Sequence, residues 1–423
     1  MNKISTVAFS ALVAGTATAA SAAPLAVLST GIPGGAAVNQ ADLTQAAVGI
    51  GVIGGCSVRL SGDGGHTWIP AALPQPQPAV PRTYCGEGAP AVLYSNDGTR
   101  LYAAYPYKTT DVYGSTVSGT LVSQSADRGI TWSAPSTAIP EVAVGEDVTE
   151  IHDLMLAVSP DSPWMYLIGT ETEYFGNNIA FYASVDNGVT WWGNNAALTA
   201  SRLEGTVLSD RASIAAGANG IVLIAYGKVV STLTPEDNQW AYVKVARSAD
   251  NGASFTQTQI ARYNVYNNGA WLTEPDIKIA HYGIAHLVFD KGRNGVFYDF
   301  SAPPYTRWTQ FPIGAAPRGY VVKEPHISTG LCGGKTVLGA TWVESLDAIP
   351  PVHKLAYTYK PAINGFRWAP PAKADLPSVG YYLNTSYIAE VGANAIVAAG
   401  EWVTGINNPF TVFGLASSGI VCR

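Results

Sequence analysis

Residues 125–132 read Ser-Ala-Asp-Arg-Gly-Ile-Thr-Trp, and near-copies of this octapeptide recur along the chain. They occupy residues 61–68, 184–191 and 248–255, and all four share the pattern Ser-x-Asp-x-Gly-x-(Thr/Ser)-(Trp/Phe). The aspartates at positions 63, 127, 186 and 250 are 64, 59 and 64 residues apart. Self-similarity at a nearly constant period predicts an array of equal structural units.

Each octapeptide has the composition of a tight turn between two strands. Glycine at the fifth position allows a positive φ. The aspartate carboxylate accepts backbone N–H groups from the residues that follow, and the Ser and Thr hydroxyls close the remaining bonds. The aromatic residue at the eighth position begins the return strand and lies beneath the turn. We therefore predict that Asp63, Asp127, Asp186 and Asp250 are turn residues and neither catalysts nor metal ligands.

The octapeptide matches the Asp-box, also called the BNR repeat, so the chain resembles the sialidase-like β-propellers. The resemblance implies blades of four antiparallel strands, with the box joining the third and fourth strands of each blade. It also implies that the boxes lie on the rim away from the catalytic face. The resemblance covers the repeat architecture of the whole chain.

Two weaker copies and a second repeat extend the period. Residues 364–368 keep the turn and the tryptophan of the octapeptide, and residues 301–308 keep only its ends. A polar start followed by two alternating apolar strands recurs six times, at residues 88–105, 152–170, 210–226, 274–289, 324–342 and 384–402. Alternation of period two between turn residues is the strand signal. The sequence thus predicts an all-β fold, a propeller of four-stranded antiparallel blades.

Six pairs of strands favour six blades. The first octapeptide, from Cys56 to Trp68, then completes a blade begun by the C-terminal strands. Seven blades stay open, because residues 409–421 offer two more strands and residues 25–52 offer a separate first blade. Either ring leaves few exposed strand edges.

Residues 1–22 have the features of a signal peptide. Lys3 supplies the charged start, residues 7–14 a short apolar core, and Ala-Ser-Ala at 20–22 a cleavage site. Residues 23–423 are expected to form a single propeller domain that is secreted, extracellular or periplasmic. No stretch reaches the roughly 18–20 apolar residues that a membrane span requires.

Composition bears on the partners of the chain. The net charge of −6 and the absence of a Lys/Arg run argue against a nucleic-acid partner. The chain has 11 Trp and 22 Tyr, many of them between predicted strands, and sugar rings stack on such faces. We expect a monomer that acts on a glycan or glycoconjugate.

Four cysteines fit an oxidising compartment. Three pairings are open, and the favoured one joins Cys56 to Cys85 and Cys332 to Cys422. No Cys-x-x-Cys spacing occurs, which argues against a thiolate zinc site.

The candidate site comes from the polar starts of the second repeat. In a propeller, residues just before the innermost strands converge at the mouth of the central channel. Charged residues make up 13% of the chain, yet nearly every polar start carries one. Candidate catalytic residues are Asp153, Asp210, Arg211, Glu274, Asp276 and Glu324, and candidate binding residues are Glu87, Glu150, His152, His326 and Asn384.

Two non-catalytic interpretations of these residues stay open. In the first, these residues satisfy the hydrogen-bonding groups of turns. In the second, some of these residues hold a cation. Carboxylates favour Ca²⁺, whereas His152 and His326 with Asp153 or Asp276 would suit another divalent metal. No cofactor is required by the sequence.

The catalytic signature of sialidases is not matched. An Arg-Ile-Pro motif is expected near the N-terminus, but residues 31–33 read Gly-Ile-Pro. The leading hypothesis is a glycan-active enzyme that hydrolyses a glycosidic bond, with carboxylates as acid and base and Arg211 holding an anionic sugar. A polysaccharide lyase using His152 or His326 is a variant of it. The alternative is a non-catalytic propeller that binds glycans or a protein.

Overall fold

The computed structural model consists almost wholly of β-strands. It describes residues 26–417 except 31, 43, 53–54, 65–66, 76–81, 86–87, 112, 144–147, 174–175, 200–205, 209–210, 231–238, 266–272, 281, 333–334, 347–351, 362–366, 376–381, 392–394 and 403–410. No helix within these residues is long and apolar enough to cross a membrane.

The described strands form seven antiparallel sheets, six of them built from strands consecutive in the chain. Blade 1 holds β2 (Ile32–Val38), β3 (Ala46–Val52), β4 (Gly55–Ser61) and β5 (Ile69–Ala72). Blade 2 holds β6 (Arg82–Tyr84), β7 (Ala91–Tyr94), β8 (Leu101–Thr110), β9 (Thr116–Ser125) and β10 (Ser136–Ala143). Blade 3 holds β11 (Val148–Val158), β12 (Met165–Glu173), β13 (Gly176–Ser184) and β14 (Trp192–Thr199).

The same plan continues in the second half of the chain. Blade 4 holds β15 (Thr206–Leu208), β16 (Ser213–Ala216), β17 (Val222–Val230), β18 (Trp240–Ser248) and β19 (Thr256–Asn264). Blade 5 holds β20 (Asp276–Ile279), β21 (Ala285–Asp290), β22 (Val296–Ser301) and β23 (Thr309–Gly314), with a 3-10 turn, η3 (Gly292–Asn294), between β21 and β22. Blade 6 holds β24 (Tyr320–Cys332), β25 (Lys335–Leu346), β26 (Val352–Pro361) and β27 (Ala372–Asp375).

The seventh sheet joins the two ends of the chain. It contains β28 (Tyr382–Val391), β29 (Ala395–Trp402), β30 (Thr411–Ser417) and, as its outermost strand, β1 (Ala26–Thr30). β1 pairs antiparallel with β30, from Ala26 opposite Gly414 to Thr30 opposite Thr411. The first and last described strands therefore close the ring together.

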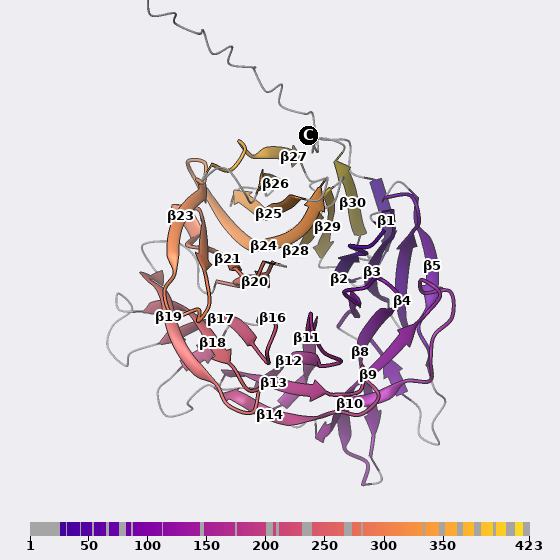
Figure 1. Cartoon of the computed structure of the whole chain (residues 1–423). Coiled ribbons are helices and arrows are strands. Elements are labelled where there is room, and N and C mark those ends of the chain that lie inside the picture. Colours follow the sequence, from indigo (N-terminus) through magenta and orange to yellow (C-terminus); the bar gives the residue numbers. More distant parts are fainter. Residues whose placement is uncertain are drawn as a thin grey trace, which may run out of the picture.

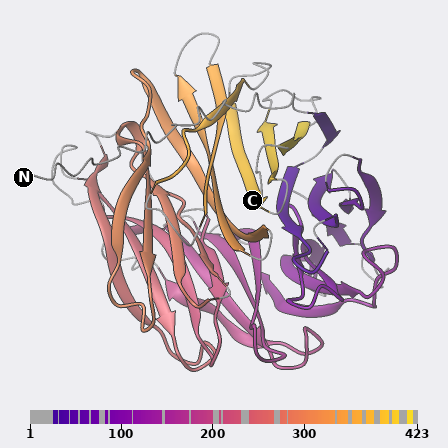
Figure 2. The ribbon, with the colours of Figure 1, turned by 45° about the horizontal axis from the view of Figure 1, so that its top comes forward.

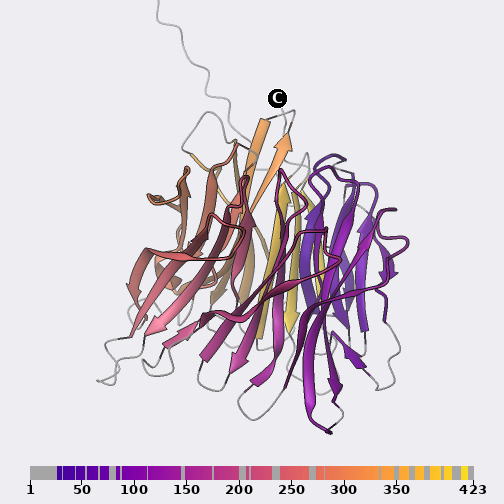
Figure 3. The same ribbon diagram turned by 60° about the horizontal axis from the view of Figure 1, so that its bottom comes forward.

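The innermost strands contact one another in the order β2, β7, β11, β16, β20, β24, β28 and back to β2 (Figure 1). Views turned toward the side of the ring show strands running between two faces that carry the connections (Figures 2 and 3). The predicted all-β propeller of antiparallel blades is confirmed. Of the two blade counts that the sequence left open, the hydrogen bonding gives seven sheets.

The first octapeptide is placed differently from the prediction. It lies in blade 1, which is made of N-terminal strands alone, and the C-terminal strands are closed by β1 instead. β2 and β3 give little sign of themselves in the sequence, because both are rich in Gly and Ala and contain no polar residue. These strands form the separate first blade that residues 25–52 offered.

The octapeptides form the predicted turns. They follow β4, β9, β13 and β18 and lead into the fourth strand of each blade. In all four, the Ser hydroxyl donates to one Asp oxygen, as Ser125 does to Asp127 at 2.8 Å, and the backbone N–H of the seventh residue donates to the same oxygen. The hydroxyl of the seventh residue donates to the second Asp oxygen, and together with the other two donors it lowers the pKa of Asp127, Asp186 and Asp250 to about 2. The aspartates are turn residues, as predicted.

The turns also join neighbouring blades. Gly252, in the blade 4 turn, has φ +88°, and a Cβ there would lie 2.2 Å from the ring of Phe181 in blade 3. The Phe255 ring packs edge-on against the same Phe181 at 5.2 Å between centroids. Buried apolar clusters fill the spaces between successive blades in the same way, from blade 1 to blade 6. The core of the molecule is thus a series of blade-to-blade contacts.

The change Gly252→Ala tests this packing. The variant should lose about 2–5 kcal/mol of stability, because a left-handed alanine costs about 1–2 kcal/mol and the overlap with Phe181 adds about 1–3 kcal/mol. Gly283→Ala is the matched control, since Gly283 has φ +81° but nothing within 4 Å of its Cβ position. Denaturant unfolding of both variants gives the comparison, and equal losses would contradict the packing argument.

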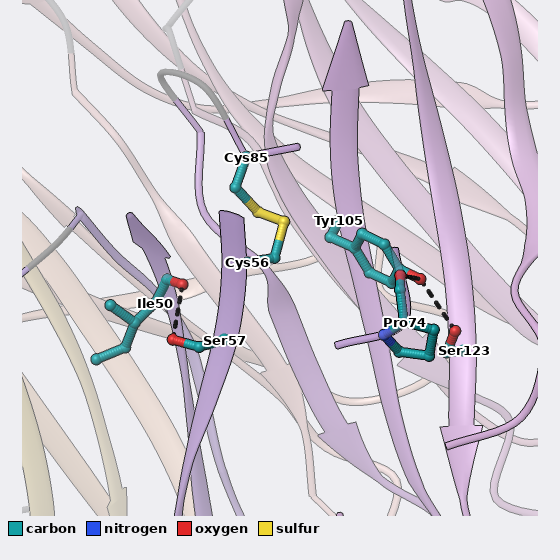
Figure 4. Close-up of a disulfide and its surroundings, with 7 residues drawn as sticks. All are labelled: Ile50, Cys56, Ser57, Pro74, Cys85, Tyr105 and Ser123. Carbon is teal, nitrogen blue, oxygen red and sulfur yellow. Dashed lines mark hydrogen bonds between the residues drawn. A yellow bond between two sulfur atoms is a disulfide. The ribbon is translucent and has the colours of Figure 1, made fainter. Parts of the chain in front are cut away.

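A disulfide ties blade 1 to blade 2, as the sequence predicted. Cys56 in β4 is bonded to Cys85, which follows β6, and both residues are buried. Nearby, the Tyr105 hydroxyl donates to the carbonyl oxygen of Pro74 at 2.8 Å and lies 3.1 Å from the Ser123 hydroxyl (Figure 4). The predicted Cys332–Cys422 pair lies outside the described residues, because Cys422 is not among them.

The double change Cys56→Ala and Cys85→Ala should lower stability by about 3–4 kcal/mol. The bond closes a loop of 29 residues, and its loss frees that loop in the unfolded chain. Denaturant midpoints of the oxidised wild type and the double variant measure the effect. A double variant that unfolds at the wild-type midpoint would contradict it.

Candidate functional site

The innermost strands are interrupted near the ring axis. β11 shifts register between His152 and Met155, and β24 does so between Lys323 and His326. β2 and β28 carry similar shifts. In blades 2 and 4 the break is wide enough to split the inner strand into β6 and β7 and into β15 and β16, whose halves pair with one neighbour. The polar starts that the sequence singled out lie at these breaks.

Each inner strand has a point at which its pairing resumes or begins. The residue two places before that point is called the break position. Pairing resumes or begins at Met155, Ser213, Asp276 and His326 in blades 3 to 6. The break positions of these four successive blades are therefore Asp153, Arg211, Glu274 and Glu324, which are all charged. The break positions of the seventh sheet, blade 1 and blade 2 are the uncharged residues Leu383, Gly34 and Ala89. The charged residues thus belong to one side of the ring.

Side chains from blades 4, 5 and 6 meet in a buried network. The Arg211 Nη1 lies 3.1 Å from His326 Nε2, although the two residues are 115 apart in sequence. His326 Nδ1 lies 3.5 Å from Asp276 Oδ2. All three side chains are at most 7% exposed. The predicted convergence of the polar starts holds for these residues.

The protonation states in this network follow from its geometry. Burial and the charge of Arg211 lower the pKa of His326 to about 4, so the imidazole is neutral near pH 7. Because a guanidinium only donates, His326 Nε2 must accept from Arg211, and the proton of the ring sits on Nδ1, toward Asp276. The Nε2 lone pair is therefore already used, which removes the support for His326 as a lyase base.

Asp276 is held on both carboxylate oxygens. Its Oδ1 accepts the Ser213 hydroxyl from blade 4, and its Oδ2 accepts the backbone N–H of Ile327 from blade 6 at 2.9 Å. Burial alone would raise the pKa of this carboxyl, but Lys278, His326 and Ser213 together bring it below its ordinary value. Asp276 is thus an ionised tie between three blades, and its catalytic assignment stays an untested prediction.

Asp153 and Glu324 share an unusual backbone conformation. Both occupy break positions, with φ of +49° and +48°. The left-handed region is costly for residues other than glycine and is found at sites where a bulge redirects a side chain. The Asp153 side chain is 28% exposed and contacts His152 Nδ1 at 2.5 Å. Burial raises its pKa, but the charges of His152 and Arg211 outweigh this and lower the pKa overall.

Glu274 sits on a buried support. The Asp290 carboxylate accepts the backbone N–H of Glu274 and that of Gly292, the latter at 3.3 Å, and bonds Thr273. Burial raises the pKa of Asp290 to about 6 despite these donors. Glu274 itself is partly exposed, as is Glu324. The backbone that carries Glu274 is therefore fixed from below while its side chain reaches solvent.

The other predicted site residues cannot be placed. Glu87 and Asp210 lie outside the described residues, and so do the side chains of Glu150 in β11 and Asn384 in β28. Within the described part of the chain, no three His, Cys, Asp or Glu side chains are grouped so that they could hold a metal ion.

Three residues that the sequence analysis missed belong to this region. Ser213 bonds Asp276, Lys278 lies 3.9 Å from it, and Asp290 supports Glu274. Alignment of the repeats at the first residue of each inner strand would have revealed Ser213, which occupies the same place as Asp276. Asp290 ends an apolar strand and gives no such signal.

The stability of the His326→Gln variant tests the network through its pH dependence. The pKa of His326 falls from 6.5 in the unfolded chain to about 4, so its contribution to stability is complete above pH 6.5 and is lost as the pH falls through 4. The variant lacks this loss. The free-energy gap between wild type and variant should shrink by about 2 kcal/mol between about pH 7.5 and about pH 5.

Urea unfolding at the two pH values measures that gap. Asp290 and Asp299, whose pKa values burial raises to about 6, titrate in the same range in the opposite sense. Both are present in wild type and variant, so they cancel in the difference. A gap that does not change with pH would contradict the buried, neutral His326.

Comparisons with known proteins support the fold. No protein-family model matches the chain, and no curated protein does. Among solved structures, it is similar to an α-L-arabinanase of Penicillium chrysogenum complexed with arabinobiose, with a TM-score of 0.52 and 11% identity over 94% of this chain and 98% of that one.

Two further structures resemble it less. The NanB sialidase of Streptococcus pneumoniae has a TM-score of 0.48 and 11% identity over 76% of this chain and 67% of that one. The GH93 α-L-arabinofuranosidase of Fusarium graminearum has a TM-score of 0.48 and 12% identity over 76% and 92%. At 11% identity, the similarity to the arabinanase shows a shared fold alone.

Proposed function

We propose that the chain is a secreted, sialidase-like propeller that hydrolyses a glycosidic bond of a glycan at the break positions of blades 3 to 6. The observation that carries the proposal is the placement of Asp153, Arg211, Glu274 and Glu324 at one structural position in four successive blades. Most glycoside hydrolases use a carboxylic acid and a second carboxylate. Residues 1–22 would be the leader of this exported, monomeric, single-domain protein.

The roles follow from the surroundings of each carboxyl group. The pKa of Asp153 is lowered by His152 and Arg211, so Asp153 would be ionised and would serve as base or nucleophile. Glu274 and Glu324 are partly exposed and are the candidates for the acid. The backbone strain at Asp153 and Glu324 supports their use in a site, because such strain costs about 1–3 kcal/mol and persists where the surroundings enforce it.

The proposal is tested by assaying the mature protein on a glycan panel. Arabinan and arabino-oligosaccharides belong on it because of the shared fold with the arabinanase, and sialosides because of the octapeptides. Asp153→Asn, Glu274→Gln and Glu324→Gln should each lower kcat by about 10²–10⁴-fold if the residue carries an acid or base role. Glu141→Gln is the matched control, since Glu141 contacts Arg82 and Tyr107 away from the break positions.

The outcomes separate the two functional hypotheses. Turnover that all three variants retain would place the chemistry elsewhere. Tight glycan binding without turnover would favour the non-catalytic propeller.

A further inference from the structure

We propose that the substrate of this site is an uncharged glycan, and that Arg211 ties the blades together and does not recognise a substrate carboxylate. This inference rests on the proposed function, since it names the substrate class of the same site. It replaces the sequence-based expectation that Arg211 holds an anionic sugar.

The Arg211 guanidinium is engaged within the protein. Its Nη1 donates to His326 Nε2 at 3.1 Å, and its positive charge lowers the pKa of Asp153. The residue is 7% exposed. To bind a substrate carboxylate, Arg211 would have to give up its buried, charge-assisted contact with His326, and that loss leaves the imidazole nitrogen unsatisfied.

The local charges also disfavour an anion. Three of the four charged break positions carry carboxyl groups, and the fourth is Arg211, whose contact is with His326. Lys278 lies 3.9 Å from the ionised Asp276 and offsets that charge. Lys323 is exposed, where solvent screens it. Two like charges 4 Å apart repel by about 1 kcal/mol in water and about 4 kcal/mol near a protein surface. A substrate carboxylate would be repelled by more than one carboxylate of the site.

The same residues are suited to binding an uncharged sugar. Carboxyl oxygens carry lone pairs that accept hydrogen bonds, and sugar hydroxyls are donors. Partly exposed Asp153, Glu274 and Glu324 suit hydroxyl groups without any need for a counter-charge.

Paired glycans that differ only in charge provide the test. Lactose-based and galactan-based oligosaccharides would be compared with their sialylated or uronic-acid counterparts, alongside neutral arabino-oligosaccharides, for binding and hydrolysis by the wild-type mature chain. We expect neutral members to be preferred by about tenfold or more, which corresponds to a single like-charge contact. The preference should shrink as salt is raised from about 0.05 to about 0.5 M.

Arg211→Lys and Arg211→Gln supply the second readout. Because Arg211 links the blades, both substitutions should lower the unfolding midpoint. The ratio of kcat/KM between neutral and acidic glycans should stay as in wild type. Preferred turnover of acidic glycans, with Arg211→Lys raising KM for those alone, would overturn the inference while the proposed function stands. A protein that neither binds nor hydrolyses glycans of either class would reject both this inference and the proposed function.

Discussion

The inner strand of every blade is an edge strand, and the ring can be stable only if its axis-facing backbone groups find partners. A buried N–H without a partner costs about 1–3 kcal/mol. Neighbouring blades supply the acceptors: Ser213 Oγ accepts from the N–H of Ile277 at 3.1 Å, and Asp276 accepts from Ile327. Blade 4 thus supplies an acceptor to blade 5, and blade 5 supplies one to blade 6. Polar side chains near the axis are needed by the architecture before any chemistry is considered.

This requirement sorts the charged residues into two groups. Asp276, His326 and Arg211 are consumed by contacts between blades and are nearly inaccessible. Glu274 lies two residues before Asp276, and Glu324 lies two residues before His326. Asp153 lies at the break of β11, and all three side chains keep access to solvent. The boundary between structural and chemical roles thus falls within the polar starts, at the level of the strand breaks.

The repeat made most of the fold predictable. The octapeptides located four of the turns, and their aspartates accept the predicted backbone hydrogen bonds because turn chemistry is local. The pairing of Cys56 with Cys85 followed for the same reason. Ring closure was harder to predict, since β1 and β30 are nearly 400 residues apart and neither β2 nor β3 has the alternation of a typical strand.

The candidate site was predictable as a set of segments but not as a set of contacts. Sequence alone indicated that Arg211, Asp276 and His326 converge, because repeats place equivalent residues around one axis. It could not tell that Arg211 donates to His326, or that Asp153 and Glu324 adopt left-handed backbone, because both depend on where each strand breaks. Asp290 supports Glu274 through tertiary burial that leaves no local pattern.

The pairing of β1 with β30 also bears on how the chain is made. Synthesis runs from the N-terminus, so β1 emerges first and its partner emerges last. Until then, blades 1 to 6 can stack on one another, but the row of blades has two open ends and β1 offers an unpaired edge. The ring is therefore completed only once β30 has been made, and a product truncated before β30 would keep both ends available for pairing with another molecule.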